Sequence, residues 1–174
     1  ILNLVKIQPK ATKSKVMVVN NTTSALSSRV ATAKDVPALL ALENVCFDTD
    51  RISVRSFKRF IREKRSDLYL VEREGLLLGY FLLLYRRGTS LARLYSLAVD
   101  PGARKQGIAE LLLQQAEQAA ATRNCVLLRL EVRKDNTAAI RLYQKLHYHE
   151  FAVKHDFYED HSDAICMQKQ IIQF

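Results

Sequence analysis

The order of apolar segments in the middle of this chain constrains its fold more than any other feature. Residues 92–99 have the pattern of a strand, residues 107–123 that of a long helix, and residues 126–132 form an almost continuously apolar second strand. A strand, a crossing helix and a further strand make a β-α-β unit, which joins parallel strands of one sheet. The apolar run predicts that the second strand is central and buried.

Further elements are expected on both sides of this unit. The expected helices cover residues 34–47, 53–65 and 136–146, and the expected strands cover residues 30–32, 68–72, 76–85, 148–155 and 164–170. Gly75 indicates a turn between paired strands, and Asn124 a left-handed residue that stops a helix. The order of elements predicts an α/β layered domain with a mixed sheet.

Composition limits the class of protein. The 174 residues suffice for one domain, and 26% charged residues with only five glycines and three prolines exclude a disordered or collagen-like chain. Residues 1–28 are expected to form a basic tail or linker, with a possible short strand at 16–19, and residues 29–174 a single domain. No apolar run approaches the roughly 20 residues of a membrane span. Three widely spaced cysteines, Cys46, Cys125 and Cys166, are typical of free thiols in a reducing cytoplasm.

The net charge of +9 first suggests a nucleic-acid or other polyanionic partner. Its distribution is uneven, because residues 1–28 carry +4 and residues 51–65 carry +6, while the rest of the chain is nearly neutral. The basic residues are not interleaved with aromatic ones, so nucleic-acid binding is the less favoured interpretation. Four histidines, at positions 147, 149, 155 and 161, lie in no metal-binding pattern, and no metal is expected.

A polar turn leads from the strand at 92–99 into the long helix. Backbone N–H groups at a helix start lack helical partners and lie at the positive end of the helix dipole, so this turn can bind an anion such as a pyrophosphate. Gly107 and Ala109 allow close approach, and Arg104 and Lys105 add positive charge. The alternative is an ordinary turn with a solvated Arg-Lys pair. Neither the GxGxxG nor the GxxxxGK[ST] pattern is present.

Two motifs carry a family resemblance. Arg104, Gly107 and Ala109, after a strand ending in Val-Asp-Pro, resemble the acetyl-CoA motif of the GNAT N-acetyltransferases. Residues 130–143, with Leu-Glu-Val-Arg, Asn136 and Leu-Tyr in order, are similar to the ribosomal-protein N-terminal alanine acetyltransferases of that superfamily. The resemblance covers about residues 29–170. It departs at His147 and at Asn124, where the family usually has glycine.

The resemblance implies a fold and a site for the co-substrate acetyl-CoA. The fold would be a mixed, mostly antiparallel sheet of six or seven strands, flanked by about four helices, with a V-shaped cofactor cleft. A bulge near Ser96 would expose the backbone to the pantetheine arm, whereas the alternative is plain ladder pairing. Asn136 would lie near the thiol end, or act only as a helix cap. The implied cofactor-binding residues are Leu97, Ala98, Val99, Arg104, Lys105, Gln106, Gly107, Ile108, Ala109, Glu110 and Asn136.

The same resemblance implies catalytic and substrate-binding residues. Glu131 would be the general base, with a salt bridge to Arg129 or Arg133 as the alternative. Tyr143 would be the acid that protonates the leaving thiolate, with a core aromatic as the alternative. Phe157 and Tyr158 would belong to an aromatic substrate-binding loop, or would be simple edge-strand aromatics.

The implied activity is direct acetyl transfer to an amine, by preference the α-amine of a protein or peptide. The alternatives are a small-molecule amine as acceptor and a non-catalytic module that binds CoA or a partner. The basic helix expected at 53–65 suggests an acidic acceptor, and the chain is expected to be a monomer or homodimer. Residues 42–50 and 86–95 resemble a bacterial subgroup in which the acetyltransferase is in some chains fused to a cysteine-peptidase-like domain.

Overall fold

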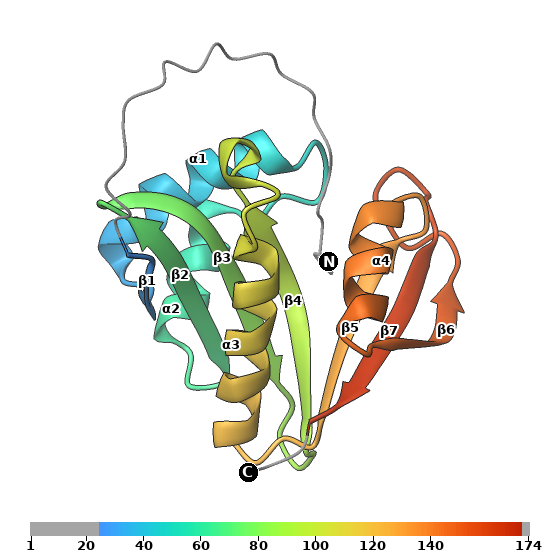
Figure 1. Ribbon diagram of the computed structural model, residues 1–174. Helices are drawn as coiled ribbons and strands as arrows, with labels where there is room; N and C mark the ends of the chain where they lie inside the picture. Colours follow the sequence, from blue (N-terminus) through green and yellow to red (C-terminus); the bar gives the residue numbers. More distant parts are fainter. Residues whose placement is uncertain (1–24, 172–174) are drawn as a thin grey trace.

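The computed structural model describes residues 25–171, which form a seven-stranded sheet with four α-helices (Figure 1). The expected tail and the possible strand at 16–19 fall almost wholly outside the described residues. The strands are β1 (Ser27–Val30), β2 (Ser66–Arg73), β3 (Leu76–Tyr85), β4 (Leu91–Val99), β5 (Leu127–Arg133), β6 (His149–Lys154) and β7 (Ala164–Gln170). The helices are α1 (Val36–Cys46), α2 (Val54–Arg62), α3 (Ile108–Thr122) and α4 (Thr137–Lys145), with short 3-10 turns η1 (Ala33–Asp35) and η2 (Pro101–Ala103).

The sheet is mixed, as predicted, with strand order β1-β2-β3-β4-β5-β7-β6. Only the β4–β5 pair is parallel in this described sheet, because α3 crosses between the two strands. After α4 the chain forms the edge strand β6 first and then returns as β7, between β5 and β6. The turn expected at Gly75 and the left-handed conformation expected at Asn124 are confirmed, since their φ angles are 77° and 58°.

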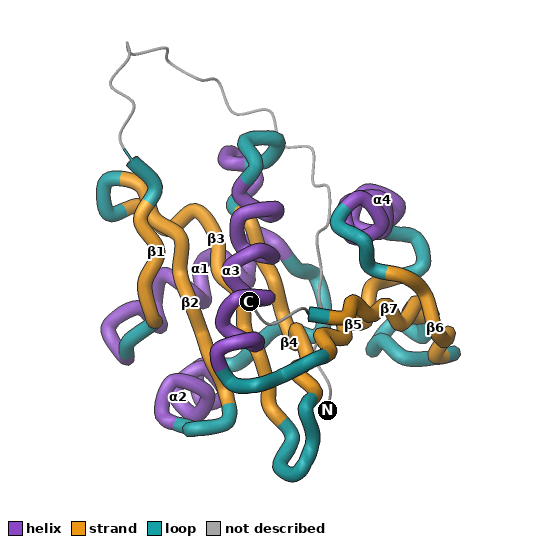
Figure 2. Tube along the Cα trace, turned by 60° about the horizontal axis from the view of Figure 1, so that its bottom comes forward, coloured by secondary structure: helices purple, strands orange, loops and turns teal. Residues whose placement is uncertain are grey.

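The helices divide between the two faces of the sheet. Side chains of α1 and α2 pack in one apolar cluster with β2 and β3, for example through Leu39, Phe57 and Tyr80. Side chains of α3 and α4 share the other cluster, which also contains the inner residues of β4 and β5. Figure 2 shows α4 over the β5, β7 and β6 end, apart from α3. Among residues 25–171, therefore, no helix packs on the α1–α2 face of β5, β7 and β6.

Several expected boundaries and faces are wrong for local reasons. The strand expected at 30–32 ends at Val30, because Thr32 starts η1 and donates its N–H to the Asp35 carboxylate at 2.7 Å. The second helix ends at Arg62 instead of residue 65, where the Ser66 hydroxyl donates to the carbonyl of Phe60 at 2.6 Å. In β5 only one face is apolar, since Arg129, Glu131 and Arg133 alternate with core residues.

The strands β4 and β5 separate after four register pairs, the last of which is Leu94 with Leu130. At the same place β4 has a bulge, because Leu82 of β3 faces Ser96 while Leu83 faces Leu94, which leaves Tyr95 as the extra residue. Beyond this point the two strands diverge towards the top of Figure 1. The predicted V-shaped opening and the bulge near Ser96 are therefore confirmed. We call this point of separation the fork.

Candidate active site

The turn that follows β4 leads into α3 and leaves the N-terminus of this helix without a side-chain cap. The Asp100 carboxylate accepts the Gly102 N–H at 2.8 Å, and Lys105 and Gly107 have φ of 61° and 78°. Gly107 is the N-cap of α3 and supplies no side chain to the first turn. The first N–H groups of the helix therefore keep their hydrogen-bonding capacity at the positive end of its dipole.

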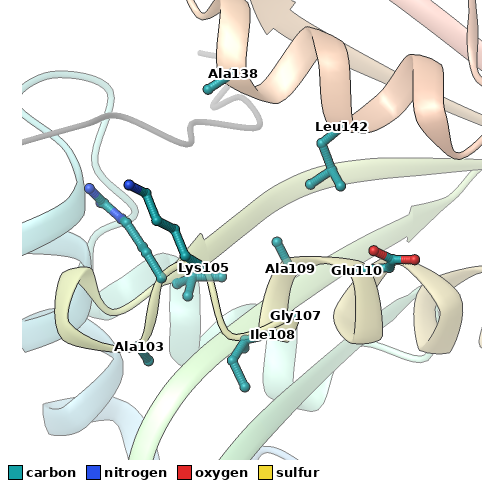
Figure 3. A pocket seen from close by; sticks show the side chains of 10 residues that line it. Ala103, Lys105, Gly107, Ile108, Ala109, Glu110, Ala138 and Leu142 are labelled. Atoms are coloured by element: carbon teal, nitrogen blue, oxygen red, sulfur yellow. The ribbon is translucent and has the colours of Figure 1, made fainter.

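A cavity of about 420 Å³ lies between this first turn and α4 (Figure 3). Its walls are Val99, Ala103, Arg104, Lys105, Gly107, Ile108, Ala109, Glu110, Ala138 and Leu142. Seven of the residues expected to bind the cofactor are among them. Ala103 and the two α4 residues were not expected, because no local pattern in the sequence shows that α4 faces α3. A Cβ added to Gly107 would meet no atom within 4 Å, so the glycine is required by its left-handed backbone and borders open space.

The other expected cofactor residues lie outside this cavity. The Gln106 side chain closes the turn on itself, since its amide donates to the Gly102 carbonyl at 3.2 Å and accepts from Arg73. Leu97 and Ala98 lie on β4 beyond the fork, where the strand pairs with β3 and no longer with β5. Asn136 caps α4 through a 3.1 Å bond from the Ala139 N–H, which is the capping role considered as an alternative.

Glu131 is the first residue of β5 beyond the fork. Its neighbours Leu130 and Val132 face the α3–α4 cluster, so its side chain lies on the opposite face, and it is only 7% exposed. The carboxylate accepts from Arg93 Nε at 2.9 Å and from Lys154 Nζ at 2.7 Å. The salt bridge considered as the alternative role is thus present, but not with the partners named for it. Arg129 instead binds Gln168, and Arg133 binds Asp135, Asp160 and Ser162.

Tyr143 is fully buried in the α3–α4 cluster, edge-to-face with Tyr148 at 5.8 Å between ring centroids. Its hydroxyl has no hydrogen-bond partner among the described residues. Burial raises the pKa of Tyr143 far above its ordinary value, so the phenol keeps its proton at neutral pH. The buried Nε of Arg104 also lacks a partner within the described chain. Unsatisfied buried groups are uncommon in proteins. Arg104 lines the cavity, whereas Tyr143 is not among its lining residues.

The expected substrate loop connects β6 and β7 and approaches the fork from the α1–α2 face. Tyr158 is buried, with the Arg133 guanidinium 5.0 Å from its ring centroid. Burial raises the pKa of Tyr158, and the positive charge of Arg133 lowers it. Phe157 is half-buried and lies 4.7 Å below Lys154 Nζ.

This loop is joined to the α1–α2 loop by two reciprocal hydrogen bonds. The Asp50 N–H donates to the Glu159 carboxylate at 3.1 Å, and the Glu159 N–H donates to the Asp50 carboxylate at 3.3 Å. Two loops distant in sequence therefore meet beside Tyr158.

A buried polar cluster behind the bulge was missed in the sequence. The Tyr80 hydroxyl donates to the Glu43 carboxylate and contacts Ser96 Oγ at 2.8 Å, and the second Glu43 oxygen accepts the Ile52 N–H at 3.0 Å. Glu43 is 1% exposed. Its burial could have been predicted from its spacing, because Glu43 follows Val36 by two helical turns and so lies on the apolar side of α1.

The cysteines and histidines lie outside this machinery. Cys46, Cys125 and Cys166 are buried free thiols, and burial raises the pKa of Cys46 to about 11. His155 and His161 contact Asp163 and Asp156. Within residues 25–171 no group of three or more His, Cys, Asp or Glu is placed to hold a metal ion. No helix in the described part of the chain has the length and apolar character needed to cross a bilayer.

Comparison with known proteins agrees with this geometry. The model of the acetyltransferase (GNAT) family matches residues 36–148, so the chain belongs to this family. An uncharacterized N-acetyltransferase of Methanocaldococcus jannaschii is 31% identical over 143 residues, which are 82% of this chain and 90% of that protein.

The relatives with an assigned substrate match over a shorter segment. The [ribosomal protein bS18]-alanine N-acetyltransferase of Salmonella typhimurium is 39% identical over 79 residues, 44% of this chain and 53% of that protein. The match thus spans about half the length of these curated relatives. The crystal structure of the ribosomal-protein-S18-alanine N-acetyltransferase of Escherichia coli superimposes with a TM-score of 0.75 at 26% identity, over 84% of this chain and 94% of that one. Ard1 of Thermoplasma volcanium shares the fold, with a TM-score of 0.79.

Proposed function

We propose that this protein is an acetyl-CoA-dependent N-acetyltransferase that transfers the acetyl group directly to the α-amine of a protein or peptide, in the cytoplasm. The observation that supports the proposal is the fork, where β5 leaves β4 just before Glu131 and where the β4 strand leads into the open start of α3. Tyr143 lies on α4, next to the cavity-lining Leu142. The names of the relatives support an N-terminal amine as acceptor.

The donor would bind along the β4 edge and the start of α3. Arg104, Lys105 and the first N–H groups of α3 supply positive potential for a pyrophosphate. The backbone of Leu97, Ala98 and Val99 offers hydrogen-bonding groups on the side that β5 has left. Acetyl-CoA, once bound, supplies the activated acetyl thioester.

The acceptor must lose a proton before it attacks, because an ammonium has no free electron pair. Glu131 would take that proton, and the hydrogen bond from Arg93 fixes the position of its carboxylate. A free α-amine has a pKa of about 7.7–8.0, against about 10.4 for lysine. The difference of about 2.5 units corresponds to about 3.4 kcal/mol, which makes an N-terminal amine the easier acceptor for a single carboxylate base.

The remaining steps use the backbone of the bulge and the buried phenol. N–H groups at the bulge around Tyr95 and Ser96 would stabilise the developing oxyanion. Tyr143 would protonate the departing thiolate, whose pKa is about 8.5, and no covalent intermediate on the enzyme is needed. The buried thiols with raised pKa support this direct route.

The test is the rate of acetyl transfer by Glu131→Gln to a set of N-terminal peptides. We expect a loss of about 100-fold or more in kcat, because the general base is removed, with the dissociation constant of acetyl-CoA unchanged. Glu117→Gln is the matched control, since Glu117 is also a carboxylate paired with a lysine, Lys169 at 2.7 Å, but lies on α3. A Glu131→Gln variant with the wild-type rate would contradict the role of Glu131.

The same assay separates the competing functions. Small amines tested beside the peptides give the higher kcat/KM if the acceptor is a small molecule. Acetyl-CoA binding without turnover on any amine would identify a non-catalytic module and would overturn the proposal.

A further inference from the structure

The general base proposed above already has an amine bound to it. Lys154 Nζ lies 2.7 Å from Glu131 Oε1, while Arg93 occupies Oε2. Lys154 is the last residue of the edge strand β6, and its side chain is 45% exposed. The pair is therefore formed at the open side of the fork and not within the core.

The position of this amine is that expected of an acceptor. An acceptor ammonium must make a hydrogen bond to the base before it gives up its proton. Arg93 donates to Oε2 and Lys154 to Oε1, so an acceptor ammonium bound at Oε1 would take the position that Lys154 now holds. The four-carbon stem of lysine is flexible and is held here at an edge strand, so its amine can move relative to the fork.

We propose, on the basis of the proposed function, that Lys154 is an internal acceptor and that the protein acetylates its own Lys154. Glu131 takes a proton from the Lys154 ammonium, and the free Nζ attacks the carbonyl carbon of the acetyl thioester. The N–C bond forms and the C–S bond breaks. The electron pair leaves with the CoA sulfur, which receives a proton from Tyr143. The nitrogen then loses its second proton, which returns through water to the Tyr143 phenolate, and Glu131 releases its own proton to water. The products are CoA and a neutral Nε-acetyl-lysine.

Self-acetylation changes the state of the base. The acetylated side chain is uncharged and has lost its ion pair with Glu131, so Oε1 becomes available to an external ammonium. The reaction is expected to be slow, because the neutral fraction of a lysine at pH 7 is about 300-fold smaller than that of an α-amine. Its intramolecular geometry offsets part of this difference.

The experiment follows the mass of the full-length chain during incubation with acetyl-CoA alone and maps the modified residue by peptide mass spectrometry. We expect one acetyl group, on Lys154, and a rate at least about 100-fold lower in Glu131→Gln. Lys169 and Lys145 are internal controls. Lys169 makes a 2.7 Å pair with Glu117 away from the fork, and Lys145 is the more exposed lysine at 67%, paired with Glu110. Lys154→Arg should give no modified peptide.

A parallel sample with an N-terminal peptide acceptor separates the two proposals. Peptide acetylation with unmodified Lys154 overturns the internal acceptor and leaves the proposed function standing. Modification of Lys154 at the same rate as Lys145, unaffected by Glu131→Gln, shows uncatalysed chemistry and also overturns it. Absence of transfer to Lys154, to peptides and to small amines overturns both. If Lys154 is acetylated but no peptide is, the result supports Lys154 as an internal acceptor and contradicts the peptide α-amine acceptor of the proposed function.

Discussion

The buried tyrosines of this protein differ in one respect that bears on chemistry. Tyr148 donates to Glu117 at 3.0 Å and Tyr85 to Asp67 at 2.7 Å, whereas the Tyr143 hydroxyl has no partner among the described residues. A buried polar group without a hydrogen bond costs about 1–3 kcal/mol. Such a cost is found at sites where a ligand completes the hydrogen bond, which supports the role proposed for Tyr143.

Replacement of this hydroxyl should separate catalysis from stability. Tyr143→Phe is expected to lower kcat by about 100-fold or more, because the thiolate loses its proton donor. Its midpoint of urea unfolding should be unchanged or higher, since no protein hydrogen bond is lost. Tyr148→Phe is the matched control and should lose about 1 kcal/mol of stability while keeping its activity. The acid role would be refuted by wild-type kcat in Tyr143→Phe.

For the Glu43–Tyr80–Ser96 cluster we expect the opposite result, namely that loss of a tyrosine hydroxyl lowers stability. Tyr80→Phe removes the hydroxyl that donates to Glu43 and contacts Ser96, so a buried carboxylate loses a donor. We expect the free energy of unfolding to fall by about 1–3 kcal/mol, measured in urea. Thr89→Val on an exposed loop, where a hydroxyl donates to the Arg86 carbonyl, serves as a control with little effect. An unchanged unfolding midpoint in Tyr80→Phe would mean that the cluster contributes nothing to stability.

Among the elements, α2 has an excess of basic residues, and the proposed reaction does not by itself account for them. Phe57 and Phe60 attach it to the core, and its basic residues are exposed, with Arg59 paired to Glu63 at 3.5 Å. The Ser53 hydroxyl caps its start by accepting the Ser56 N–H at 3.2 Å. The helix directly follows the α1–α2 loop that meets the β6–β7 loop, so its positive face begins beside the proposed acceptor side.

Charge reversal on α2 tests whether this face selects acidic acceptors. Replacing Arg55, Lys58 and Arg59 by Glu should raise KM for acidic peptides several-fold, with little change in the KM of acetyl-CoA, because only the acceptor side loses positive potential. The effect should weaken as salt is added. Arg86→Glu with Arg87→Glu, on the exposed β3–β4 loop, is the control for overall charge. If the KM for acidic peptides is the same in the α2 variant as in the control variant, the α2 charge is only a solvated surface and does not select the acceptor.

At the scale of the whole molecule, two apolar clusters hold the helices against the two faces of the sheet, and both contain tyrosines. Burial raises the pKa of Tyr80, Tyr85, Tyr143, Tyr148 and Tyr158. A raised pKa in the folded state means that folding favours the protonated phenol. This contribution is complete below the unfolded pKa of about 10 and is lost as pH rises above it.

Stability should therefore decline steeply on the alkaline side. We expect the unfolding midpoint to fall as pH rises above about 10, with tyrosinate absorbance appearing together with loss of circular dichroism. Exposed tyrosines would ionise near pH 10 without unfolding. Full tyrosinate formation in the folded protein near that pH would contradict the burial of these phenols.

Much of the fold was predictable because its signals are local. The β-α-β order, the left-handed Asn124 and the glycine that starts α3 follow from short stretches of sequence. The family motifs were recognisable for the same reason, since the turn before α3 and the segment around Glu131 are each continuous. The missed boundaries were decided by single side chains, such as the Ser66 hydroxyl that ends α2.

By itself, the sequence determined the kinds of element, their order and the residues available to the site. Only the tertiary structure decided that β7 inserts between β5 and β6, that α4 faces the start of α3, and that β4 and β5 part after Leu94 and Leu130. It also decided that Glu131 binds Arg93 and Lys154 instead of its sequence neighbours. The physical reason is that these contacts join residues far apart in the chain, whose meeting depends on how all the layers pack together.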